Sequence, residues 1–194
     1  MLMILLDLLL GVPALVWLCS VLRAIIKRTR FLIRIAGICG KHGYTLRSPR
    51  PALASFFRAS SKPDLIIHTP ACDYHLRFIT CIRRKKFYHF ISENAYATHF
   101  RLGIMLPMAK ETSTTALFAR YHELPAFDSA SDGKPVQSIL LFNPLPVEIT
   151  RFDEKSGTEP ATNGVKIGRF TVYDASRFTE LLADKAVSSP SHCI

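Results

Sequence analysis

The first 22 residues of the chain contain one charged side chain, Asp7, and the run closes at Arg23. Such a run restricts the fold strongly, because a helix of about 20 apolar residues fits the hydrocarbon core of a bilayer and fits poorly in water. Its uncharged part, Leu8 to Leu22, is 15 residues long and slightly short of this length. We therefore predict one N-terminal transmembrane helix, residues 1–26, in which Arg23 extends its side chain to the headgroups so that residues 24–26 join the span.

The charges around this run predict its orientation. Basic residues follow it closely and none precedes it: Arg23, Lys27, Arg28, Arg30 and Arg34. Because Lys and Arg accumulate on the cytoplasmic side of membrane helices, we predict a single-pass protein of the cell membrane with its C-terminal domain in the cytoplasm. The sequence lacks the basic start and the small-x-small cleavage site of a signal peptide. A cleaved leader and a buried or interfacial helix are therefore weaker alternatives.

Charge is distributed unevenly along the chain. Residues 1–86 carry 15 Lys and Arg against three acidic residues, and residues 87–194 carry 10 against 12. A basic zone beside an apolar helix favours a bilayer with anionic inner-leaflet lipids as the partner, and the five basic residues named above are its expected contacts. A second basic group consists of Arg83, Arg84, Lys85 and Lys86. It has three interpretations, which are contact with these lipids, contact with nucleic acid, or a solvated turn. Nucleic acid is the less favoured partner, and a protein partner is not identified by the sequence.

The rest of the chain has the length and apolar content of one compact domain. Gly37, Gly40 and Gly43, followed by a Ser-Pro-Arg-Pro turn at residues 48–51, predict a linker between the helix and this domain. We expect an anchor at 1–26, a basic juxtamembrane segment and linker at 27–51, a domain at 52–187 and a tail at 188–194.

Strand-length runs of β-branched and aromatic residues recur through the domain, and short connections between the first three favour an antiparallel arrangement. A short helix is expected near 52–60, and residues 112–121 fit a helix or a strand. A closing helix is expected at 175–186, capped by Asp174 or Ser176. The predicted class is α+β, with a largely antiparallel sheet and a C-terminal helix. The expected strands are 64–69, 74–82, 87–91, 95–102, 136–142, 147–152 and 165–173.

One stretch resembles a known family. Residues 62–67 read Lys-Pro-Asp-Leu-Ile-Ile, and residues 75–78 read His-Leu-Arg-Phe. This pattern resembles the core hairpin of restriction-endonuclease-like nucleases, in which two acidic residues hold a divalent cation and a lysine positions the attacking water. The resemblance places Asp64 at the first acid, His75 at the second and Arg77 at the lysine. Imidazole is a poor Mg²⁺ ligand and guanidinium a poor base, so the resemblance implies a catalytically degenerate domain. The layout also resembles uncharacterised membrane-anchored bacterial proteins, which brings no assigned activity.

Other chemistries lack their patterns. Residues that could hold zinc lie at 68, 72, 75, 81 and 89, without two close ligand pairs. We find no nucleophile elbow and no phosphate-binding loop. Five cysteines without framework spacing favour a reducing compartment. We therefore expect no catalytic, metal or cofactor site. The leading hypothesis is a non-catalytic interaction or structural module at the inner membrane face. A degenerate nuclease-like domain that binds nucleic acid near the membrane, or an unrecognised enzyme, are the alternatives.

Overall fold

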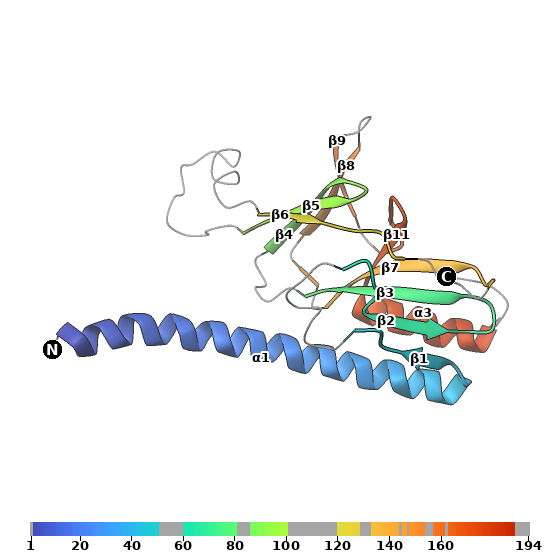
Figure 1. The fold of residues 1–194 in the computed structure, drawn as a ribbon, viewed down its shortest axis with the longest axis horizontal. Coiled ribbons are helices and arrows are strands. Elements are labelled where there is room, and N and C mark those ends of the chain that lie inside the picture. Colours follow the sequence, from blue (N-terminus) through green and yellow to red (C-terminus); the bar gives the residue numbers. More distant parts are fainter. Residues whose placement is uncertain are drawn as a thin grey trace.

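The computed structural model describes residues 2–50, 60–80, 86–100, 120–128, 133–143, 145–146, 148–153, 157–161 and 163–188. Within them lie two helices and two mixed sheets (Figure 1). The helices are α1 (Leu2–His42) and α3 (Ala175–Ser188). Sheet A contains, in spatial order, β1 (Thr45–Arg47), β2 (Leu65–His68), β3 (Asp73–Ile79), β7 (Val136–Phe142), β11 (Phe170–Asp174) and β10 (Lys166–Ile167). Sheet B contains β6 (Arg120–Glu123), β5 (Ala95–Phe100), β4 (Lys86–Ser92), β8 (Glu148–Asp153) and β9 (Gly157–Pro160).

The α+β domain is therefore built on two mixed sheets, which corrects the single, largely antiparallel sheet predicted from sequence. The hairpins β2–β3 and β4–β5 are antiparallel, as short connections require. In contrast, β7 pairs in parallel with both β3 and β11, and β4 pairs in parallel with β8. These parallel pairs join segments far apart in the chain, and local turn patterns carry no information about them.

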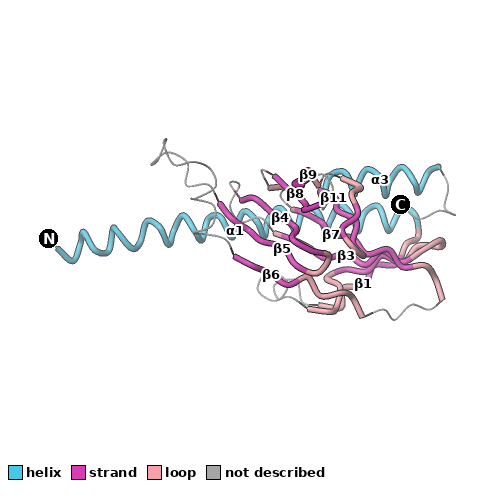
Figure 2. Tube along the Cα trace, turned by 90° about the horizontal axis from the view of Figure 1, so that it is seen from above, coloured by secondary structure: helices cyan, strands magenta, loops and turns pink. Residues whose placement is uncertain are grey.

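Sheet A lies between the helices and sheet B. Along β3, side chains alternate between the two faces of the sheet. Tyr74, Leu76 and Phe78 pack with buried residues of α1 and α3, whereas Ile79 packs with buried residues of β4 and β7 on the other face. Figure 2 shows both helices beside the strands, and the first part of α1 extends beyond the rest of the described chain in both views.

Within the part of the chain that the structure describes, no helix has a stretch long and apolar enough to cross a bilayer. The predicted single-pass transmembrane helix is therefore wrong. The reason is visible in the charges: Asp7 and Arg23 leave 15 uncharged residues between them, about 22 Å of helix, against a hydrocarbon core of about 30 Å. Four further basic residues follow Arg23 between residues 27 and 34.

Helix α1 also crosses the expected boundary at residues 26 and 27 without a break, and it does not end at Gly37 or Gly40. A glycine inside a helix costs only about 1 kcal/mol. Burial of the stripe Phe31, Ile35 and Cys39 against the domain offsets this cost. The helix ends at His42. Gly43 follows with a left-handed φ of 68°, and the Tyr44 amide donates to the Cys39 carbonyl at 2.9 Å.

At the other end of the chain, α3 begins as predicted. Asp174 is the capping residue, because its Oδ1 accepts hydrogen bonds from the amides of Ser176 and Arg177 at 2.8 and 3.0 Å. Phe178 and Leu182 are buried against α1 and sheet A. Other expectations fall outside the described residues. These are the short helix near 52–60 apart from residue 60, segment 112–121 apart from its last two residues in β6, and the tail after residue 188.

Candidate functional site

The projecting helix, defined as residues 11–22 of α1, exposes a large apolar surface. Six large apolar side chains are more than half exposed: Val12 53%, Leu15 61%, Val16 61%, Trp17 53%, Leu18 55% and Leu22 55%. Residues 15–18 are consecutive, and consecutive residues of a helix are about 100° apart, so these four side chains surround the axis. A helix that is apolar on all sides is typical of a buried environment, and exposed patches of this size mark interaction sites.

The projecting helix is exposed because α1 meets the domain only further along. Contact begins at Ala24, which is 3% exposed, and continues at Arg28, Phe31, Ile35 and Cys39. These residues are three or four apart and form one face of the helix. Among the described residues, nothing covers the segment before Ala24 in the same way.

The predicted basic contacts occupy two different environments. Arg23, Lys27, Arg30 and Arg34 are exposed, and no acidic residue lies between residues 11 and 42. Arg28 is only 5% exposed, and its guanidinium lies 4.3 Å from the centroid of the Phe78 ring. Burial lowers the pKa of Arg28, while the charge of Asp64 acts to raise it. The buried position of Arg28 differs from the surface contact that we expected.

A pocket of about 210 Å³ lies at the root of the projecting helix, between α1, the end of β7 and the start of α3. Asn143 holds two of its walls together, because its Nδ2 donates to the Lys27 carbonyl at 3.3 Å across 116 residues of sequence. Sequence reasoning missed the pocket, since no local pattern connects Asn143 or the first turn of α3 with α1. The lining residues are Lys27, Arg30, Phe31, Arg34, Asn143, Ala175, Ser176 and Thr179.

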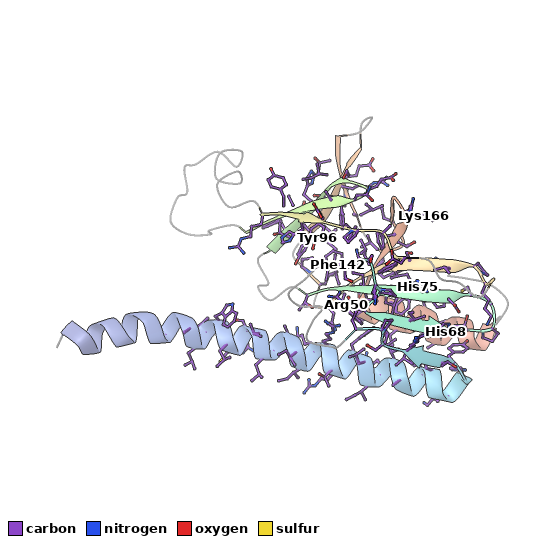
Figure 3. All side chains as sticks on the ribbon, in the orientation of Figure 1. Arg50, His68, His75, Tyr96, Phe142 and Lys166 are labelled. Atoms are coloured by element: carbon purple, nitrogen blue, oxygen red, sulfur yellow. The ribbon has the colours of Figure 1, made fainter. Side chains whose placement is uncertain are left out.

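The three positions of the nuclease-like pattern lie near one another, and each is engaged inside the protein. Asp64 is 4% exposed. Its Oδ1 accepts from Arg50 Nη1 at 3.1 Å and its Oδ2 accepts from the Phe78 amide at 2.8 Å. Burial raises the pKa of Asp64, opposed by the Phe78 amide and by the charges of Arg28, Arg50 and Arg77. Both carboxylate oxygens therefore accept hydrogen bonds from the protein itself. Figure 3 shows Arg50 between α1 and sheet A.

Arg77 and His75 are held in the core between the sheets. The Arg77 guanidinium donates to the carbonyls of Ser60 and Pro125, the latter at 2.6 Å, and lies 4.6 Å from the Phe127 ring centroid. Burial lowers the pKa of Arg77 to about 10, against the charge of Asp64. His75 is 3% exposed and meets Phe127 edge to face, with ring centroids 5.9 Å apart. The described residues contain no group of three or more potential metal ligands.

The second basic group falls mostly outside the described residues. Arg83, Arg84 and Lys85 are not among them, and Lys86 is the first residue of β4. The lipid, nucleic acid and solvated-turn interpretations of this group all stay predictions.

No family model matches the sequence, and neither a curated protein nor a solved structure matches the chain. The resemblance to restriction-endonuclease-like nucleases and to membrane-anchored bacterial proteins therefore stays a prediction.

The burial of His75 predicts a pH-dependent stability. Desolvation by burial lowers the pKa of His75, with smaller effects from Asp73, which raises it, and His68, which lowers it. The folded protein thus favours the neutral ring, whose Nδ1 has no hydrogen-bond partner among the described residues. The free energy of unfolding is therefore highest above the pKa of His75 in the unfolded chain, which is about 6.5. It decreases as the pH falls below this value, because the unfolded chain takes up the proton before the folded protein does.

We expect urea unfolding to show a smaller loss of stability between pH 7.5 and pH 5.5 for His75→Phe than for the wild type. His42→Phe is the matched control, since His42 is exposed, and it should keep the wild-type pH dependence. An unchanged pH dependence in His75→Phe would assign the effect to another group.

Proposed function

We propose that this protein is a non-catalytic interaction module that binds the surface of an anionic lipid bilayer through the projecting helix. The observation that carries the proposal is the all-round apolar surface of residues 11–22, followed by a segment whose only charges are positive. A bilayer surface offers an apolar zone and a negatively charged zone next to each other. The helix would lie in the interface and not cross it.

The apolar side chains contribute more to the binding free energy than the basic side chains do. Full burial of a large apolar side chain is worth about 1.5–3 kcal/mol, and a helix lying in the interface buries roughly half of its surface. Six such side chains on the projecting helix would together contribute several kcal/mol. Each basic residue near an anionic surface adds about 1 kcal/mol. The exposed residues Arg23, Lys27, Arg30 and Arg34 then favour anionic over neutral lipid.

A second copy of the chain is a poorer occupant of this surface. Pairing two copies of α1 in parallel would place the basic segments at residues 23–34 side by side, with no acidic residue between 11 and 42 to pair with them. Like charges at such distances are destabilising. An anionic lipid surface supplies the negative charges that this pairing lacks, beside an apolar zone for the helix. In a cell the anionic leaflet is the cytoplasmic one, so the domain would lie on that side.

The proposal predicts that Leu15→Glu with Leu18→Glu reduces binding to vesicles of phosphatidylcholine and phosphatidylserine by about tenfold or more, because two apolar contacts are lost and two negative charges are added. Co-sedimentation with vesicles measures the binding. Both side chains are more than half exposed, so circular dichroism and the urea midpoint should stay unchanged.

The matched control is Ile91→Glu with Tyr121→Glu, which changes two exposed hydrophobic residues of sheet B, 42% and 76% exposed. It should bind as the wild type does. Equal binding by all three proteins would disprove the proposal. Loss of self-association in the α1 variant, seen by light scattering without any vesicle binding, would assign the surface to a second copy.

A further inference from the structure

The pocket at the root of the projecting helix has the features of a small anion site. Lys27, Arg30 and Arg34 line it from one face of α1, spaced three and four residues apart, and Phe31 between them is buried. None of the eight lining residues is acidic. Its volume of about 210 Å³ is below the roughly 300–1,000 Å³ of pockets for larger organic ligands, so the occupant is small.

The three basic side chains supply the binding groups. Within the described residues, the ends of Lys27, Arg30 and Arg34 form no ion pair or hydrogen bond with the protein. The hydroxyls of Ser176 and Thr179 already donate, to Asp174 Oδ1 and to the Ala175 carbonyl, at 2.6 Å each. The first amides of α3 are likewise bonded to Asp174. Arg and Lys side chains bind phosphate oxygens through charge-assisted hydrogen bonds.

The position of the pocket indicates the source of the phosphate. Lys27 follows Leu22, the last residue of the projecting helix, by five positions, which is about 7.5 Å along the axis. A projecting helix that lies in the interface therefore keeps the pocket beside the lipid headgroups that surround the helix. The hydrogen bond from Asn143 to the Lys27 carbonyl fixes α1 against sheet A and holds the pocket in shape.

We infer that the pocket formed by Lys27, Arg30, Arg34, Asn143 and the first turn of α3 binds the phosphate group of an anionic lipid headgroup. The inference rests on the proposed function and adds a preference to it. The apolar helix supplies the affinity for the bilayer, and the pocket distinguishes a phosphate from another negative charge.

The test uses the full chain and two vesicle types of equal negative charge, one with phosphatidic acid and one with oleate. The wild type should bind the phosphatidic acid vesicles about fivefold more tightly, because a phosphate has more acceptor oxygens than a carboxylate and can accept from Lys27, Arg30 and Arg34 together. Arg30→Gln with Arg34→Gln should remove this preference. The matched control is Arg23→Gln with Arg47→Gln, two exposed arginines outside the pocket. It loses the same charge and should keep the preference.

The outcomes separate the two proposals. A protein that binds neither vesicle disproves the proposed function. A protein that binds both equally, or whose preference survives Arg30→Gln with Arg34→Gln, disproves the pocket alone. A third arm adds inorganic phosphate without vesicles and measures the unfolding midpoint. If phosphate raises this midpoint in the wild type and not in the variant, while vesicle preference is absent, the ligand is a soluble phosphate and the lipid source is wrong.

Discussion

Asp64→Ala is expected to lower the free energy of unfolding by about 3–5 kcal/mol, the range for removing one partner of a buried ion pair. The carboxylate joins Arg50, in the segment after β1, to the Phe78 amide of β3, at 3.1 and 2.8 Å. Its removal leaves a buried amide without its acceptor and takes away the negative charge that acts on Arg28, Arg50 and Arg77. Urea unfolding followed by circular dichroism measures the change.

Two further variants sharpen this result. Asp64→Asn keeps an acceptor for the Phe78 amide and removes the charge, so it should fall between the wild type and Asp64→Ala. Glu180→Ala breaks an ion pair of equal length, 3.1 Å to Arg177, between side chains 51% and 60% exposed. It should cost about 0–1 kcal/mol, as exposed pairs do. An Asp64→Ala protein as stable as Glu180→Ala would show that the pair contributes little to the fold.

Asp64 shows why the site was harder to predict than the fold. A Pro-Asp before a strand resembles the first acidic position of restriction-endonuclease-like nucleases, and in the structure both oxygens of Asp64 accept hydrogen bonds from Arg50 and Phe78. Arg50 is 14 residues away in the chain, between two prolines, and nothing in that sequence indicates a buried partner. The basic residues of α1 were predicted as one group of lipid contacts, and this stays a prediction. Which of them is buried depends on where the domain meets the helix, and that is a tertiary property.

The strands likewise divide into those that the local sequence indicates and those that depend on tertiary pairing. The run at 136–142 was predicted within its observed bounds because β7 lies between two neighbours, and its last four residues are buried. In contrast, β1 and β9 were missed, and β6 begins inside segment 112–121, for which a helix and a strand were both left open. They contain three or four residues and lie at sheet edges, where pairing with one neighbour defines a strand that local composition does not show.

The part of helix α1 that contacts the domain has a buried side and an exposed side, and one pair of substitutions distinguishes them. Ile35→Ala is expected to lower the free energy of unfolding by about 2–5 kcal/mol, because Ile35 is 0% exposed in the core shared with sheet A and α3. Ile33→Ala, two residues earlier and 66% exposed, should change it by no more than about 0.5 kcal/mol. Urea unfolding of the two proteins measures both effects with the same chemical change. Equal effects would mean that this half of α1 is not docked. The pocket would then lose its wall, because Lys27, Arg30 and Arg34 lie on the same docked segment.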